Sequence, residues 1–382
     1  MRKAILYIGG FNLPDKNAAA QRVISNAKLF RQAGYEVVLI GLSSDITTVG
    51  KIFEFDGFSC LNLKYPRTII QWYYYLFTIK WYKSFIKKLQ PEVVIAYNHP
   101  GMALRALLNF NGQRGILTIS DCTEWYEPDG NFLFKSIKGW DINQRMRYVH
   151  PKLDGIVVIS NFLDNYYKEK GCKTLLLPPL VDLKEQKWNV QVTRNDDSIR
   201  LVYAGSTGRN KDRLDMIIMA LEKICSNSNI NLHFNVIGMS QEQYYNTYSR
   251  TIGTKVPSFV KFLGRLSHIE VIKLLRGSDF QIFIRENNLA NTAGFPTKFA
   301  ESISSGILVL TNHSSDLKEY LHDGINGYSL NISSLEELVD SLKRPLLLSF
   351  NEIQNKKENI DRRTFDYHNF IDVTKSFFDS IK

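Results

Sequence analysis

The chain has 382 residues and a formal net charge of +10, and this length predicts two or three domains. Hydrophobic residues make up 44% of the sequence, which is enough for sizeable cores, and no apolar run reaches the roughly 18 residues that a membrane span requires. The apolar run after the first residues ends at Gly9-Gly10 and is too short for a signal peptide. The four cysteines include no Cys-x-x-Cys pair, which argues against a zinc site or a disulfide framework. We therefore expect a cytoplasmic protein.

The positive charge is concentrated in the first half of the chain. Residues 1–182 contain 23 Lys and Arg against 15 Asp and Glu, a net +8, whereas the remainder contains 25 and 23, a net +2. A basic half indicates an anionic partner, either a membrane surface or a nucleic acid. Nucleic acid is disfavoured because no recognised binding module accompanies the basic residues.

The first 41 residues predict a doubly wound α/β opening. A buried strand over residues 3–8 ends in Gly9-Gly10, a helix follows over 18–32, and a second strand covers 36–41. Glycines after a first strand allow close approach of a ligand, so Gly10 is a candidate binding residue. The Gly-x-Gly-x-x-Gly pattern is absent and no acidic residue ends the second strand, which argues against a dehydrogenase.

Residues 69–89 are crowded with aromatic side chains and carry Lys80, Lys83, Lys87 and Lys88. On one helix these lysines would form a single stripe. Interfacial aromatics beside lysines are typical of an amphipathic helix lying on an anionic bilayer. The alternative is a surface helix packed on the N-terminal sheet with a solvated basic edge.

Two further strands are predicted over residues 93–97 and 115–120. The second is followed by Asp121 and Glu124, at the end of a parallel strand where ligands bind in open α/β sheets. Either carboxylate could act as a base toward a hydroxyl. The alternative for each is a helix cap or a surface acid.

The domain boundary is predicted near the middle of the chain. A strand over 154–160 leads to the proline-containing segment 177–182, whose prolines favour an extended connection, and the polar run 191–198 resembles a linker. A second α/β domain begins with a strand over 199–204. The predicted domains are residues 1–190, residues 198–350, and a largely helical C-terminal segment, residues 351–382.

The most informative stretch runs from Asn291 to Tyr328. Pro296 is expected at the first helical position, which needs no backbone N–H, and Gly306 is expected to end the helix. An apolar run over 307–310 then predicts a buried strand. An ordinary αβ turn that begins with a proline is the alternative interpretation.

The start of this helix is suited to anion capture. Backbone amides at Phe295, Thr297 and Lys298 would point out of a helix N-terminus and could hold a phosphate. Glu301 lies one turn further on the same face, where its carboxylate could accept the hydroxyls of a ribose.

This stretch resembles the donor-site signature of glycosyltransferase family 4. Glu301 falls on the second Glu of the family's paired-Glu motif, whereas Ala293 stands where the first is expected. Three segments match the rest of the signature: Gly294-Phe295 the turn, Ser305–Val309 the small-Gly-apolar segment, and Asp323–Tyr328 the final loop. The Phe-Pro-Thr-Lys form resembles a branch found in bacterial surface-polysaccharide synthesis.

The resemblance also implies roles for residues outside this stretch. Lys211 keeps the place of a cation that neutralises the leaving diphosphate, but Ser206 replaces the usual Arg, for which Arg209 is a candidate substitute. Arg285, Glu286 and Asn291 are candidates to replace the missing Glu. The predicted catalytic residues are Asp121, which stands where many relatives have a His, Lys211 and Glu301. The predicted donor-binding residues are Gly10, Gly205, Ser206, Arg209, Lys211, Arg285, Gly294, Phe295, Pro296, Thr297, Lys298 and Glu301.

The resemblance implies the GT-B fold, in which two doubly wound Rossmann-like domains face each other across a cleft. Residues 1–190 would then bind the acceptor, residues 198–350 the nucleotide-sugar donor, and the C-terminal helix of residues 351–382 would cross back onto the first domain. It implies transfer of a sugar from a UDP- or GDP-linked donor, with retention of configuration and without a metal or cofactor. The acceptor would be a lipid-linked or growing surface glycan at the inner face of the plasma membrane.

Two other functions are compatible with the same fold. A sugar-nucleotide epimerase would need acids and histidines around the sugar, and the seven histidines show no such clustering in sequence. A catalytically inactive partner subunit would explain the two substituted donor positions, Ala293 and Ser206.

Overall fold

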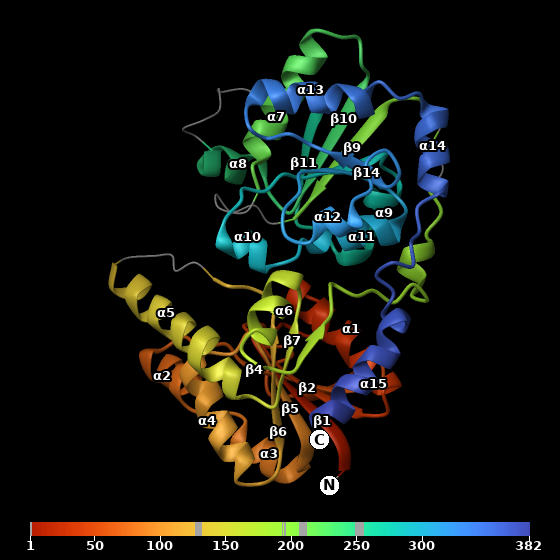
Figure 1. Cartoon of the computed structure of the whole chain (residues 1–382). Coiled ribbons are helices and arrows are strands. Elements are labelled where there is room, and N and C mark those ends of the chain that lie inside the picture. The colour runs from red at the N-terminus through yellow and green to blue at the C-terminus, as the bar shows by residue number, and fades with distance from the viewer. Residues whose placement is uncertain (1, 127–131, 193, 195, 206–211, 249–255) are drawn as a thin grey trace. The chain divides into compact units, whose positions relative to one another are not determined.

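The structure is a computed structural model that describes residues 2–126, 132–192, 194, 196–205, 212–248 and 256–382 (Figure 1). The chain forms two compact units. The first comprises Met1–Leu180, Ala293–Phe295 and Tyr367–Lys382, and the second comprises Val181–Thr292 and Pro296–Asp366. Each unit contains a largely parallel sheet with helices packed on it, so the predicted class of two doubly wound α/β domains is confirmed.

The sheet of the first unit has eight strands in the order β3-β4-β2-β1-β5-β6-β7-β8. Only the β3–β4 pair is antiparallel among the pairs that the structure describes. The strands are β1 (Arg2–Gly9), β2 (Glu36–Ser43), β3 (Ile52–Phe55), β4 (Phe58–Lys64), β5 (Pro91–Tyr97), β6 (Leu117–Cys122), β7 (Gly155–Val158) and β8 (Thr174–Leu176).

Both faces of this sheet are buried, as expected for a parallel sheet covered by crossover helices. The helices are α1 (Ala18–Gln32), α2 (Ile69–Phe77), α3 (Lys83–Leu89), α4 (Gly101–Gly112), α5 (Phe132–Gln144), α6 (Asn161–Lys168) and α15 (Ile371–Ser380). Alternate residues of β1 enter different cores: Ile5 and Tyr7 join side chains of α1 and α15, whereas Leu6 and Ile8 join side chains of α3 and α4.

The prediction of one helix over residues 69–89 is wrong, because the chain leaves the helix at Thr78. This residue is extended, with φ −136° and ψ 167°. Its hydroxyl donates to the Tyr74 carbonyl at 2.8 Å and accepts from the Lys80 amide at 3.2 Å. A threonine hydroxyl that bonds nearby backbone groups offers the chain an alternative to the helix. Lys80 therefore lies between α2 and α3, and the lysines do not form one helical stripe.

The sheet of the second unit has six strands in the order β11-β10-β9-β12-β13-β14, and all its described pairs are parallel. Its strands are β9 (Ile199–Ala204), β10 (Leu232–Ile237), β11 (Val260–Gly264), β12 (Phe280–Ile282), β13 (Leu308–Thr311) and β14 (Gly327–Ser329). Its helices are α7 (Leu214–Ser226), α8 (Gln241–Tyr248), α9 (His268–Arg276), α10 (Leu289–Ala293), α11 (Thr297–Ser305), α12 (Leu317–Tyr320), α13 (Leu335–Leu346) and α14 (Phe350–Glu358).

The observed segments differ from the predicted domain limits at two places. The passage between the units falls at Val181, before the polar run 191–198. The C-terminal segment 351–382 is divided, since α14 belongs to the second unit and α15 to the first, with a non-helical stretch from Ile360 to Asp366 between them.

Candidate functional site

The second sheet reverses its strand order between the neighbouring strands β9 and β12. The chain proceeds outward from β9 through β10 and β11, and then returns to pair β12 with β9 on the other side. In open parallel sheets, ligands bind outside the carboxyl ends of the strands at such a switch point. Gly205 follows β9, Arg285 lies shortly after β12, and α11 begins there as the connection to β13. Three of the predicted site segments therefore meet at this edge.

Helix α11 begins at Thr297, and Pro296 is its N-cap residue with φ −73° and ψ 101°. The predicted start is therefore displaced by one residue. The Pro296 carbonyl accepts from the Phe299 amide at 2.9 Å, and Gly306 ends the helix in the left-handed conformation as predicted, at φ 72°. The partial positive charge at the start of the helix favours an anion beside Thr297.

The side chain of Lys298 lies in a buried polar cluster behind this helix start. Its Nζ donates to the Tyr203 hydroxyl at 2.8 Å and forms an ion pair with Asp212. The ammonium also lies 4.0 Å from the centre of the Tyr203 ring, a favourable cation–π arrangement. A Cβ at Gly205, which has φ +154°, would collide with the Lys298 side chain. The predicted site glycine therefore makes room for a protein side chain.

Asp212 is the centre of this cluster. Its carboxylate accepts from the Tyr203 hydroxyl at 2.6 Å, from Arg285 Nε at 3.2 Å and from Lys298, and its own carbonyl accepts from the Tyr248 hydroxyl at 2.9 Å. Burial works to raise the pKa of Asp212, but the charges of Lys298 and Arg285 outweigh it and hold the pKa at about 2. Asp212 is therefore ionised at neutral pH.

Glu301 lies one turn into α11, and its side chain is 19% exposed. Its Oε1 lies 3.3 Å from Nε2 of His268, the first residue of α9. The His268 ring meets the Trp188 ring edge-to-face, with 6.1 Å between centroids. Sequence reasoning identified Glu301 but missed His268, since α9 and α11 are brought together only by the fold.

The residues proposed to replace the missing Glu are engaged in different ways. Glu286 accepts from Arg213 Nη1 at 3.0 Å. Asn291 is buried and donates to the Glu286 carbonyl at 2.8 Å, which shapes the loop before α10. Arg285 is held by Asp212, and Ala293 itself is buried at the end of α10. Of the three candidates, Arg285 is thus the one joined to the Asp212 cluster.

The predicted cation loop contributes Ser206, Arg209 and Lys211, and all three lie outside the described residues. Gly205 marks the last described position before it and Asp212 the first after it. The loop therefore starts and ends at the cluster that contains Lys298.

Asp121 is fully buried at the end of β6 in the first unit. Arg22 from α1 donates to it through Nε at 3.1 Å and Nη2 at 2.8 Å, and the Tyr7 hydroxyl donates to its Oδ2. Burial and then the Asp121 charge raise the pKa of Tyr7 well above its usual value. Asp121 thus joins α1 to the sheet, and action as a base toward an acceptor would require this ion pair to open.

A more exposed polar cluster lies beside Asp121, past the ends of β5 and β6. Asn98, which has φ 41°, donates from Nδ2 to the Thr123 hydroxyl at 2.6 Å and to the Tyr126 hydroxyl at 3.3 Å. Glu124 is partly buried in the same segment. Gly10 is exposed at the end of β1, and a Cβ there would lie 3.6 Å from the Tyr75 hydroxyl.

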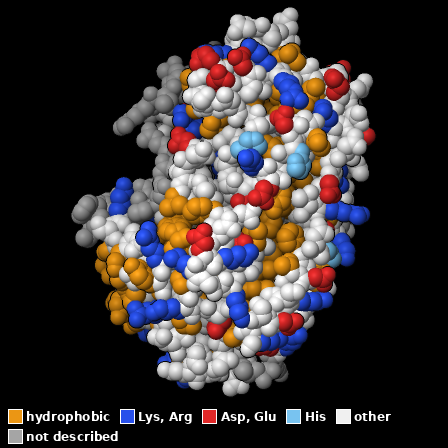
Figure 2. Space-filling model, in the orientation of Figure 1, with side chains coloured by type: hydrophobic (Ala, Val, Ile, Leu, Met, Phe, Trp, Pro, Cys, Tyr) orange, Lys and Arg blue, Asp and Glu red, His pale blue; other side chains and the backbone are white. Residues whose placement is uncertain are grey.

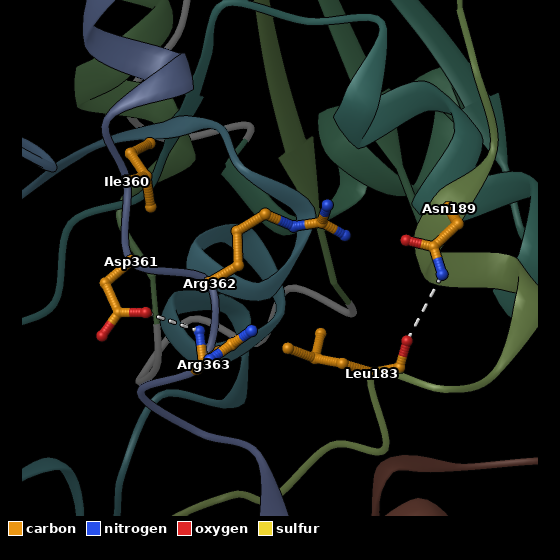
Figure 3. A pocket seen from close by; sticks show the side chains of 6 residues that line it. All are labelled: Leu183, Asn189, Ile360, Asp361, Arg362 and Arg363. Atoms are coloured by element: carbon orange, nitrogen blue, oxygen red, sulfur yellow. Dashed lines mark hydrogen bonds between the residues drawn. The ribbon is translucent and has the colours of Figure 1, made fainter.

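A cavity of about 420 Å³ lies in the second unit, away from the switch point (Figure 3). Arg362 lines it, and this side chain donates to the carbonyls of Ser304 and Trp188. Ser304 lies at the C-terminal end of α11, so Arg362 complements the negative end of that helix. The cavity is lined by Leu183, Asn189, Ile360, Asp361, Arg362 and Arg363.

Within the described residues, no group of three or more His, Cys, Asp or Glu side chains is arranged to hold a metal ion. In the part of the chain that the structure describes, no helix is both long and apolar enough to cross a membrane.

Residues 184–363 match a protein-family model described as "Glycosyl transferases group 1". No curated protein sequence matches the chain.

Solved structures resemble the whole chain at low sequence identity. Sucrose-phosphate synthase from Thermosynechococcus elongatus has a TM-score of 0.72 and 12% identity, with 99% of each chain covered. Anabaena Alr3699/HepE in complex with UDP-glucose has a TM-score of 0.67 and 12% identity, also with 99% of each chain covered. WaaG, a glycosyltransferase involved in lipopolysaccharide biosynthesis, has a TM-score of 0.65 and 14% identity over 97% of this chain and 98% of its own.

At this level of identity the likeness establishes the fold, and the family match covers the unit that contains the Asp212 cluster, Glu301 and the start of α11. The family model therefore matches just under half of the chain, and the solved structures share its two-domain fold over nearly its whole length.

Proposed function

We propose that the protein transfers a sugar from a nucleoside-diphosphate sugar to an acceptor hydroxyl, as a member of glycosyltransferase family 4. The observation that carries this proposal is the meeting of the α11 N-terminus, Lys298 and Arg285 at the switch point of the second sheet. A helix start with the Arg285 guanidinium beside it is suited to a diphosphate, and Lys298 lies behind it, paired with Asp212. The UDP and UDP-glucose complexes of Alr3699/HepE support a nucleotide-sugar donor. We propose a UDP- or GDP-linked donor and take UDP as the first probe.

The chemistry of transfer follows from where charge accumulates. As the bond between the sugar and the diphosphate breaks, negative charge gathers on the leaving diphosphate, and fixed positive groups that face it lower the barrier. We assign this task to the start of α11 and Arg285, together with Lys211 and Arg209. Glu301 would accept the ribose hydroxyls, and His268 would orient it. We propose that these groups act without a metal, and that the acceptor attacks the donor on the same face with retention.

Thermal unfolding in the presence of UDP, GDP and other nucleoside diphosphates tests the donor site. A nucleotide that binds only the folded state should add about 2.7 kcal/mol of stability at a hundred times its dissociation constant. Glu301→Ala should abolish most of the shift. If no nucleoside diphosphate stabilises the wild-type chain, the donor proposal is refuted in favour of an inactive partner subunit. Turnover of donor without any acceptor would instead indicate an epimerase.

We further propose that the acceptor is lipid-linked, a surface glycan or its precursor, and that the first unit docks on an anionic membrane. The α2 patch, Ile69, Ile70, Tyr73 and Phe77, is the supporting observation. Ile69 is 88% exposed and Ile70 66%, and α2 has no buried residue at all. An exposed apolar patch of this kind indicates a surface that a membrane or a partner covers.

The charge around the α2 patch favours a bilayer with anionic lipids. From Gly57 to Gln90 the sequence carries six Lys and Arg and no Asp or Glu. Lys80 lies 3.9 Å from the centre of the Tyr74 ring, which places a cation directly beside the aromatic surface. Figure 2 shows hydrophobic side chains with Lys and Arg beside them in this region. Helix α5, which like α2 contacts α4, adds the exposed Ile137 and Trp140.

Co-sedimentation with vesicles tests the membrane proposal. The full chain should bind vesicles that contain phosphatidylglycerol and bind pure phosphatidylcholine vesicles weakly. Ile69→Glu with Ile70→Glu should lower binding about tenfold or more, because two apolar side chains lose a favourable transfer and two acids are added. Ile46→Glu is the matched control, since Ile46 is 81% exposed outside the α2 patch. Equal binding by the double variant and the control would refute the membrane proposal.

A further inference from the structure

We propose that Arg285 is the arginine that binds the donor diphosphate, and that Asp212 positions it by holding its inner nitrogen. This inference rests on the proposed donor and goes beyond it by making Asp212 the residue that positions Arg285. The sequence alone left that position open, because Ser206 stands where an Arg is expected and Arg209 was its candidate substitute.

The backbone of Arg285 is fixed by a reciprocal pair of hydrogen bonds. Its amide donates to Asn312 Oδ1 at 2.8 Å, and its carbonyl accepts from Asn312 Nδ2 at 2.8 Å. Asn312 is buried just past the end of β13. Because Arg285 follows β12 and Asn312 follows β13, these two bonds fix the position of the Arg285 backbone beside the switch point.

Among the described residues, the guanidinium of Arg285 is held from its inner side only. Nε donates to Asp212 Oδ1 at 3.2 Å, and among the described residues no partner is seen for Nη1 or Nη2. These two nitrogens form the outer fork of a planar group that matches two phosphate oxygens. Since Nε is fixed, the direction of the fork is fixed as well. The side chain is 13% exposed, so solvent or a ligand reaches it.

The Asp212 carboxylate is itself held in place by several bonds. Its Oδ1 faces Arg285, whereas its Oδ2 accepts from Tyr203 and Lys298, so each oxygen has its own partners. The carboxylate is nearly buried, and Tyr248 anchors its backbone carbonyl. A group that is bonded on both oxygens and through its main chain has little freedom to turn. Arg285 is thus attached to a rigid support.

The opposite end of β12 provides a direct comparison. There Arg194 Nη1 donates to both oxygens of Asp279, at 2.6 and 2.7 Å, so the outer nitrogen of Arg194 is used within the protein. Asp279 also accepts from the Arg200 amide at 2.9 Å, which ties it to the start of β9. The Arg194 pair uses that nitrogen at the amino edge of the sheet, whereas no residue that the structure describes uses the Arg285 fork at the carboxyl edge, where a ligand is expected.

A purely electrostatic account makes the opposite prediction for Asp212. If this carboxylate only balanced the charges of Arg285 and Lys298, then Asp212→Asn would remove a nearby negative charge and tighten the binding of an anion. If Asp212 positions Arg285, the same change frees the guanidinium and leaves the buried Lys298 without its counter-charge, which disfavours its charged form. Binding of the diphosphate then weakens.

Titration calorimetry of the full chain separates the two accounts, with UDP and GDP compared against uridine and guanosine. We expect Asp212→Asn, Arg285→Gln and Arg285→Lys each to weaken nucleoside-diphosphate binding about tenfold, the loss expected when a charge-assisted contact is removed. Binding of the bare nucleoside should stay unchanged. The double variant Asp212→Asn with Arg285→Gln should weaken binding by less than the product of the two single losses, because both changes act in part on the Arg285 guanidinium.

Arg194→Gln is the matched control and should lower the melting temperature without changing nucleoside-diphosphate affinity. If Asp212→Asn binds the nucleoside diphosphate as tightly as the wild type or more tightly, or if Arg285→Gln binds it unchanged, this inference is overturned while the donor proposal survives. Should Asp212→Asn fail to fold, the two Arg285 variants still decide the matter. A wild-type chain that binds neither nucleoside diphosphate would overturn the donor proposal, and this inference with it.

Discussion

Each sheet carries a buried aspartate at its carboxyl edge, but the two aspartates hold their arginines differently. In the first unit, Arg22 gives Nε and Nη2 to Asp121 and Nη1 to the carbonyl of Leu177, so the whole guanidinium is used. In the second unit, Asp212 takes only Nε of Arg285. A buried acid after a parallel strand is therefore no sufficient sign of chemistry. The difference lies in the outer nitrogens of the partner arginine, which have partners in Arg22 and, among the described residues, none in Arg285.

The largest expected effect concerns the buried Arg22–Asp121 ion pair of the first unit. Asp121→Asn should lower the free energy of unfolding by about 3–5 kcal/mol, because it leaves the Arg22 charge buried without a counter-charge. Urea denaturation monitored by circular dichroism measures this loss. The exposed pair Lys16–Asp45 gives the control, and Asp45→Asn should have little effect. A loss of less than about 1 kcal/mol for Asp121→Asn would show that Asp121 is free to serve another role.

An intermediate loss of folding stability is expected when low pH protonates Asp212, the partner of Arg285. The folded pKa of Asp212, at about 2, lies below its usual value of about 3.9. Its contribution to stability is thus complete above about pH 4 and is lost as the pH falls toward about 2, an effect on the order of 2 kcal/mol. Urea denaturation of the wild type and Asp212→Asn between pH 5 and about pH 2 measures it. The difference between the two curves should shrink with acid, and a constant difference would contradict this account.

The smallest expected effect concerns His268, whose ring lies beside the Glu301 carboxylate. His268→Ala should weaken UDP binding about fivefold, because loss of one orienting contact of roughly 1 kcal/mol lets the carboxylate turn away from the ribose. Calorimetric titration with UDP measures it. His233→Ala is the control, since His233 is exposed on β10 of the same sheet. Equal affinity of both variants would show that Glu301 is positioned without His268.

The regular elements were predictable where a local pattern determines them. The helix over 18–32 and the strand over 199–204 have the predicted bounds, because caps and apolar periodicity are local signals. The break at Thr78 was missed, since a hydroxyl bond to the Tyr74 carbonyl competes with the helix without changing the apolar pattern.

The candidate site was predictable only in part. Gly306 and the start of α11 were visible as turn chemistry, and Glu301 as a spacing along one helix. The partners of those residues were not visible, because Asp212 and Lys298 lie 86 positions apart and Arg22 and Asp121 lie 99 apart. Asp212 stands next to the predicted Lys211, and that adjacency was the one local signal that could have suggested it.

The first and last residues of the second unit, Val181 and Asp366, lie side by side. Val181, its first residue, donates its amide to the Phe365 carbonyl at 2.9 Å and forms a parallel bridge with Asp366, its last. The stretch from Val181 to Asp366 is therefore closed on itself like an insertion, with its two ends already joined by hydrogen bonds. Chains of this kind tolerate new termini elsewhere when the old ends are linked. All six strands of the second sheet, β9 to β14, lie between these two joined ends, so that sheet is formed without any strand from outside the stretch.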